Sequence, residues 1–185
     1  FLAAQLGKLF SPRDERLLMP ENTDGERSGH VIIAGYGRVG RSVSAILKQQ
    51  SIDYVALDLD ADSVRRNREV DEPVYYGDAA RPDVLRQVGA DDAKVVLITL
   101  DEPEAAMRVV QAVKRLWPEL IILVRARDAG HSEELYANGA DAVMPETIEA
   151  SLRLAAMVLE RVDVDAEVIG ACLDEVRKQE YREVV

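Results

Sequence analysis

The sequence predicts an α/β fold built on a doubly wound, parallel, six-stranded sheet with a helical extension at its C-terminal end. Three observations lead to this prediction. Short apolar segments alternate with amphipathic ones from residue 30 to about residue 162. The first apolar segment opens directly into a glycine-rich turn with the sequence GYGRVG. The segment 94–99 is a nearly continuous apolar run, as expected of a strand that is covered on both faces.

The elements follow one another as strand and helix throughout this region. We expect strands at residues 31–34, 54–58, 74–76, 94–99, 121–124 and 142–144. We expect helices at residues 39–50, 61–69, 82–88, 102–117, 129–138 and 147–162. Pro82 and Pro103 suit first helical turns, whereas Gly89, Pro118 and Gly139 each end a helix.

The chain divides into three regions by composition. Residues 1–10 form a short amphipathic piece, and residues 11–29 are rich in proline, glycine and charge, which indicates a linker. Residues 30–162 carry the alternating pattern of the main domain, and residues 163–185 form a charged tail that we expect to be helical. Because the chain begins inside an apolar stretch, we expect residues 1–29 to be a tether from a membrane domain.

Bulk composition excludes some classes of protein. The 185 residues are 48% hydrophobic, which argues against a disordered chain. With a net charge of −11, the chain lacks the positive electrostatic field that nucleic-acid binding needs, so we expect no nucleic-acid partner. Cys172 is the single cysteine and permits no internal disulfide, which fits a reducing compartment.

The glycine-rich turn is the strongest functional signal. In the pattern Gly35-x-Gly37-x-x-Gly40, we expect the first glycine to make the tight turn, the second to let a phosphate approach and the third to allow close packing of helix on strand. The turn also contains Tyr36, Arg38 and Val39. A glycine-rich turn without a ligand is the alternative interpretation.

Acidic residues at later strand ends support a nucleotide. Asp58 ends the second strand, 23 positions after Gly35, where a carboxylate can accept hydrogen bonds from a ribose and repel a 2′-phosphate. We therefore expect AMP or NAD(H) rather than NADP(H). Further candidates at the same edge of the sheet are Leu59, Asp60, Gly77, Asp78, Ala79, Thr99 and Asp101. Asp60 could instead cap the next helix, and Asp78 could be a structural turn residue.

A basic cluster is expected at the same edge. It consists of Arg38 in the glycine turn and of Arg125, Arg127 and His131 after the fifth strand. Such a cluster suits an anionic regulatory ligand or a charged partner surface. Alternatively, the residues after the fifth strand form ion pairs with Asp128, Glu133 and Glu134, and Arg38 is a solvated arginine.

Catalytic and metal-binding motifs are absent from the sequence. We find no nucleophile elbow, no zinc-protease motif and no Walker-type lysine, so we expect neither catalytic residues nor a metal site. An NAD-dependent oxidoreductase module is the alternative function, with His131 as its candidate acid or base. A dimerisation module with an empty glycine turn is a third interpretation.

Taken together, the segments GYGRVG, LDLD, YGDA and VRARD resemble the RCK domain, also called KTN or TrkA-N. The likeness covers about residues 30–162 and is greatest to the cytoplasmic regulatory domain of Kef-type potassium/proton antiporters. It implies a homodimer of Rossmann-like domains that binds AMP or NAD(H). It also implies control of a transmembrane antiporter domain on the same polypeptide, at the cytoplasmic face of the cell membrane.

The resemblance further implies a glutathione-type effector near the dimer interface. In Kef-type proteins the arginine of the glycine turn and the first arginine of the RARD segment take part, and these match Arg38 and Arg125. Residues 163–185 depart from the Kef segment that completes the glutathione site. The resemblance to Kef-type proteins therefore supports nucleotide binding by this chain more strongly than it supports gating by glutathione.

Overall fold

The computed structural model describes residues 28–127 and 129–182 and contains one six-stranded, all-parallel sheet. The strands lie in the order β3-β2-β1-β4-β5-β6. Strands β2 and β3 are thus added on one side of β1, and β4, β5 and β6 are added on the other side. The strands are β1 Val31–Ala34, β2 Tyr54–Asp58, β3 Val74–Tyr76, β4 Val95–Ile98, β5 Ile121–Ala126 and β6 Ala142–Pro145. This arrangement confirms the predicted doubly wound fold.

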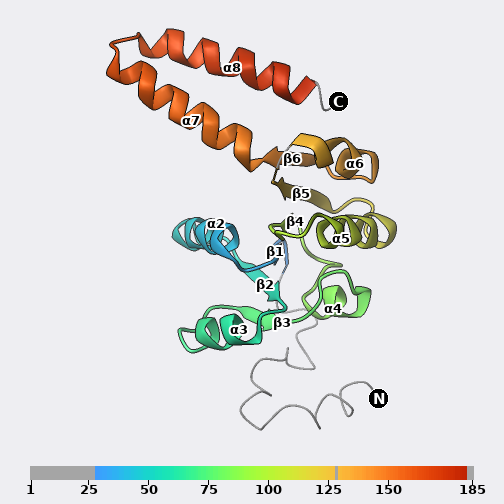
Figure 1. The fold of residues 1–185 in the computed structure, drawn as a ribbon. Helices are drawn as coiled ribbons and strands as arrows, with labels where there is room; N and C mark the ends of the chain where they lie inside the picture. The colour runs from blue at the N-terminus through green and yellow to red at the C-terminus, as the bar shows by residue number, and fades with distance from the viewer. Residues whose placement is uncertain (1–27, 128, 183–185) are drawn as a thin grey trace.

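The helices form layers on both faces of the sheet (Figure 1). One layer contains α2 and α3, and the opposite layer contains α4, α5 and α6, whereas α7 and α8 extend beyond β6 as a helical hairpin. The helices are α2 Arg38–Gln49, α3 Ala61–Arg68, α4 Pro82–Gln87, α5 Pro103–Leu116, α6 Ser132–Ala137, α7 Glu146–Arg161 and α8 Ala166–Arg182, and a 3₁₀ turn covers Ala129–His131.

Each face of the sheet has its own apolar core. The larger core joins Ile32, Val55 and Ile98 to buried residues of α4, α5 and α6. The smaller core lies under α2 and α3 and contains Ile33 and Tyr36. Burial on both faces explains why the central strands are continuous apolar runs.

Several details differ from the sequence prediction. The helix expected at 129–138 begins with the 3₁₀ turn. Ile46 of α2, Leu116 of α5 and Ala155 of α7 face outward, although the spacing of apolar residues along each helix predicts that they are buried. On α2 the buried positions are Gly40 and Ser44 instead. The amphipathic piece and most of the linker lie outside the described residues.

The hairpin of α7 and α8 is held by a few specific contacts. Ile169 of α8 is buried, as are Leu152 and Ala156 of α7. Arg177 of α8 donates to both carboxylate oxygens of Glu149, at 3.0 and 3.2 Å. Within the described residues, no helix is both long and apolar enough to cross a lipid bilayer.

Candidate functional site

The glycine turn after β1 has the geometry expected of a phosphate-binding turn. Gly35 adopts a φ of +96°, and a Cβ on Gly40 would lie 2.4 Å from the carbonyl oxygen of Gly35. A Cβ on Gly37 would meet no described atom within 4 Å. The turn therefore needs Gly35 for its conformation and Gly40 for close packing, and it leaves open space above Gly37 at the start of α2.

Asp58 is joined directly to this turn. Its Oδ2 accepts a hydrogen bond from the backbone N–H of Tyr36 at 2.6 Å, and its Oδ1 accepts one from the backbone N–H of Asp60 at 2.8 Å. Two fixed donors hold the carboxylate at the end of β2. A carboxylate has about four acceptor positions, so these bonds leave it able to accept from a further hydroxyl.

The other acidic residues at this edge have local structural bonds. Asp60 caps α3, because its Oδ1 accepts from the backbone N–H groups of Asp62 and Ser63. This is the capping role that the sequence left open for Asp60. Oδ1 of Asp78 accepts from the N–H of Ala80 at 2.9 Å, the bond of a structural turn aspartate.

The remaining candidates lie at the same edge in different environments. Thr99 is buried, and its hydroxyl donates to the carbonyl of Gly35 at 2.7 Å, so it braces the glycine turn from beneath. A Cβ on Gly77 would lie 2.8 Å from Val84, and Ala79 is buried. Leu59 is exposed beside Asp58 and offers an apolar surface to a planar ring.

A cleft of about 630 Å³ lies between the glycine turn, the ends of β4 and β5, and the first turns of α7. Arg38, Arg125 and Arg127 line it together with Asp101. The structure thus brings three of the four predicted basic residues to one cleft. His131 is not among the described residues that line it; it ends the 3₁₀ turn before α6.

Arg125 connects three elements across this cleft. From β5 it donates to Asp101, which follows β4, at 2.6 Å, and from Nε to Oε2 of Glu146, which begins α7, at 2.6 Å. A second guanidinium nitrogen, Nη2, forms an ion pair with the same Glu146 oxygen at 2.5 Å. The hydrogen bond from Arg125 lowers the pKa of Asp101, and the charges of Arg38 and Arg127 act in the same direction. The ion pairs described for Arg125 are therefore with Asp101 and Glu146, not with Glu133 or Glu134.

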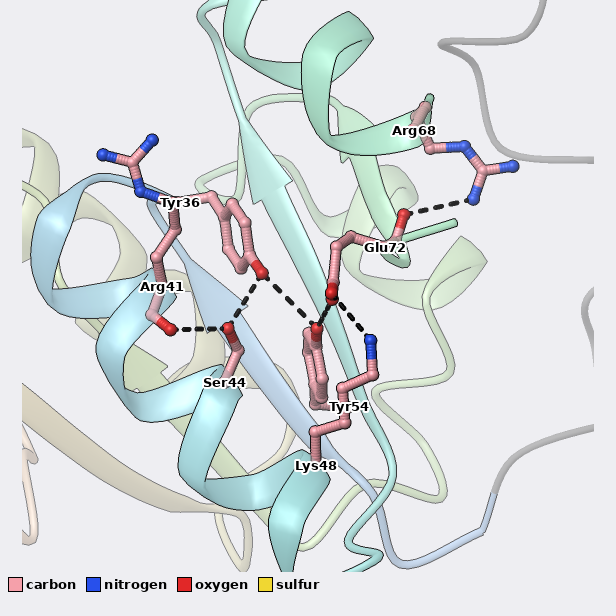
Figure 2. A network of polar contacts seen from close by, with 7 residues as sticks. All are labelled: Tyr36, Arg41, Ser44, Lys48, Tyr54, Arg68 and Glu72. Carbon is pink, nitrogen blue, oxygen red and sulfur yellow. Dashed lines mark hydrogen bonds and ion pairs between the residues drawn. The ribbon is translucent and has the colours of Figure 1, made fainter. Parts of the chain in front are cut away.

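A buried polar network behind the glycine turn escaped sequence reasoning (Figure 2). The hydroxyl of Tyr36 lies 2.8 Å from that of Ser44 and 3.4 Å from that of Tyr54. Tyr54 donates a short hydrogen bond to Glu72, which also pairs with Lys48 at 2.8 Å. The one available signal was Ser44, a polar residue at a helix position that its neighbours predict to be buried.

The network shifts the ionisation of its members. Burial, followed by the hydrogen bond to Glu72, raises the pKa of Tyr54 above its ordinary value. Burial opposes ionisation of Glu72, but hydrogen bonds from Lys48 and Tyr54 outweigh it and lower its pKa. At neutral pH Glu72 is thus a carboxylate and the hydroxyl of Tyr54 is neutral. Among the described residues, no group of three or more histidine, cysteine or acidic side chains is placed to hold a metal ion.

Comparison with known proteins identifies relatives of the chain. The family model described as the TrkA-N domain matches residues 31–146. K(+) efflux antiporter 2, chloroplastic, from Arabidopsis thaliana is 40% identical over 176 residues, which are 95% of this chain and 15% of the antiporter. The glutathione-regulated potassium-efflux system protein KefC from Klebsiella pneumoniae (strain 342) is 38% identical over 141 residues, or 76% of this chain and 23% of KefC. The chain thus spans less than a quarter of these two relatives.

A solved structure is also similar to this chain. The Shewanella denitrificans Kef CTD in its AMP-bound form superimposes with a TM-score of 0.74 at 30% sequence identity. The match covers 84% of this chain and 95% of the Kef chain. The likeness therefore includes nearly the whole of that domain.

Proposed function

This chain belongs to the TrkA-N domain family, and from that premise we propose that it is a regulatory domain that binds an adenosine nucleotide, AMP or NAD(H), and controls a potassium efflux antiporter. The observation that carries the proposal is the open glycine turn next to a fixed carboxylate. Phosphates would lie over Gly37 at the start of α2, and the ribose would be held by Asp58. The AMP-bound Kef relative supports the choice of ligand.

The carboxylate also sets the expected specificity. Asp58 would accept hydrogen bonds from both hydroxyls of a ribose and repel a 2′-phosphate. Leu59 offers an apolar surface beside it for the adenine. AMP and NADH are therefore expected to bind, and NADPH to bind more weakly.

Control of transport would pass through the cleft and the dimer. The three arginines favour an anionic effector of the glutathione type, bound between the glycine turn and the start of α7. The domain would act as a homodimer, joined to the transmembrane domain of the same polypeptide at the cytoplasmic face of the membrane. Ligand binding can change transport only through its differential affinity for two arrangements of that dimer.

Calorimetric titration of the chain with AMP, ATP, NADH and NADPH tests the nucleotide proposal. We expect binding of AMP and NADH and its loss in Asp58→Ala. Asp141→Ala is a matched control, because Asp141 likewise accepts a backbone N–H, that of Ile122 at 2.7 Å, but at the opposite edge of the sheet. Absence of binding by all four nucleotides, or equal affinity of Asp58→Ala and the wild type, would contradict the proposal.

A further inference from the structure

Tyr36 is the residue of the glycine turn whose two ends lie in different environments (Figure 2). Its backbone N–H donates to Asp58 at 2.6 Å, at the edge where the nucleotide is proposed to bind. The residue is 3% exposed, and its ring points between α2 and β2, toward Ser44 and Tyr54. One residue therefore joins the ribose carboxylate to the buried network.

The network fixes the position of the Tyr36 ring from three elements. Ser44 comes from α2, Tyr54 from the start of β2, and Glu72 from the segment between α3 and β3. Tyr36 and Ser44 form a chain in which Tyr36 donates to Ser44 and Ser44 donates to the carbonyl of Arg41 at 3.0 Å. Tyr54, whose hydroxyl lies 3.4 Å from that of Tyr36, donates to the carboxylate of Glu72. Hydrogen bonds in such a chain strengthen one another.

Packing alone does not require these polar groups. Phenylalanine at positions 36 and 54 would fill nearly the same space without the cost of burying hydroxyls. The charged carboxylate of Glu72, with 19% of its side chain exposed, accepts from Tyr54, and Lys48 neutralises it. The arrangement selects one position of the Tyr36 ring, and hence one position of its amide.

We propose that Tyr36 is a positioning residue of the nucleotide site: its hydrogen bond to Ser44 and its contact with Tyr54 anchor the side chain, so that its amide holds the Asp58 carboxylate ready for the ribose. This inference rests on the proposed nucleotide function and assigns no ligand contact to Ser44, Tyr54 or Glu72. According to this inference, residues of the polar network behind the edge of the sheet determine the affinity for the nucleotide. Because the ribose is common to both ligands, AMP and NADH are affected alike.

Removal of single hydroxyls tests the proposal. Tyr36→Phe and Tyr54→Phe are expected to weaken AMP and NADH binding by roughly three- to tenfold each in calorimetric titrations, the effect of about one hydrogen bond. Tyr136→Phe is the matched control. The Tyr136 hydroxyl accepts the N–H of Val143 at 3.0 Å at the far end of the sheet, so its removal alters stability and leaves affinity unchanged.

A double-mutant cycle separates positioning from general destabilisation. In an Asp58→Asn background, Tyr36→Phe is expected to cause little further loss of affinity, because the group that it positions is altered. An equal loss in both backgrounds, or unchanged affinity in Tyr36→Phe and Tyr54→Phe, overturns the inference alone. Failure of the wild-type chain to bind AMP or NADH overturns the proposed function and this inference together.

Discussion

Each glycine of the turn after β1 is required for a different physical reason. Gly35 has a positive φ, Gly40 lies against the carbonyl of Gly35, and Gly37 faces open space with an ordinary extended conformation. Gly35 and Gly40 are required for the fold of the protein itself, whereas Gly37 is required to leave space for the proposed ligand. Stability and binding should therefore respond separately to substitution within six residues.

Alanine at Gly40 and at Gly37 makes this difference measurable. Gly40→Ala forces a methyl group onto a backbone oxygen and is expected to lower the free energy of unfolding by about 1–3 kcal/mol in urea denaturation. Gly37→Ala is expected to unfold like the wild type but to bind AMP more weakly, because its methyl group occupies the phosphate position. Equal stability of Gly40→Ala and Gly37→Ala would contradict the packing role of Gly40.

The roles of residues within one short motif were predictable from the sequence, whereas contacts between residues far apart in the sequence were not. The roles of Gly35 and Gly40 follow from the spacing of the turn. The bond between Tyr54 and Glu72 does not, because it depends on where α3 ends and how β3 returns to the sheet. Asp60 was left open between ligand and cap, and only the geometry of α3 shows the cap.

At the scale of elements, proline and glycine signals placed helix ends well. Pro82 and Pro103 both begin their helices, and the strands agree with prediction to within two residues at each end. Helix faces were harder to predict, because spacing alone does not say which partner covers a face. On α7 the residues Leu152 and Ala156 are buried, whereas Ala155 is exposed.

The hairpin of α7 and α8 should depend on a small number of contacts. Ile169 is the buried apolar residue among the described side chains of α8, so Ile169→Ala removes much of the packing that holds this helix. We expect hydrogen exchange of α8 amides to accelerate by on the order of tenfold or more, while amides of the sheet are unchanged. Val168→Ala, at a neighbouring position that is 51% exposed, is the control. Uniform acceleration across the molecule would contradict local release of α8.

At the scale of the whole molecule, the sheet order places the site. The order changes direction between β1 and β4, and the glycine turn and Thr99 lie at this switch point, where open parallel sheets bind ligands. Alternation of strands and helices predicted the doubly wound parallel sheet, but not the order of its strands. The direction in which α7 leaves the sheet was not predictable, because it depends on how β6 ends.

An apolar stripe runs along the outer face of α7 to the residue that follows it. It consists of Leu154 and Val158 of α7 and of Val162 at the C-cap, each more than 60% exposed and spaced four residues apart. A stripe of this kind on an extended helix suits a second copy of the chain, in agreement with the proposed homodimer. It is continuous with the arginine cleft, because Leu154 lines both.

Charge on this stripe should separate the proposed dimer. We expect Val158→Glu to shift the molar mass from dimer to monomer in size-exclusion chromatography with light scattering, because the charge would be buried at the interface. Arg153→Ala changes an exposed position of the same helix outside the stripe and should stay dimeric. A Val158→Glu chain that keeps the wild-type mass would place the dimer contact elsewhere.

The junction of β6 and α7 has a mechanical consequence. The strand ends at Pro145 and the helix begins at Glu146, with no linking residue between them. A helix of 16 residues is about 24 Å long, so a rotation of about 10° at its base moves its far end by about 4 Å. A tilt of α7 at its base, where Glu146 pairs with Arg125, would therefore be larger at the far end of the helix than at the edge of the sheet.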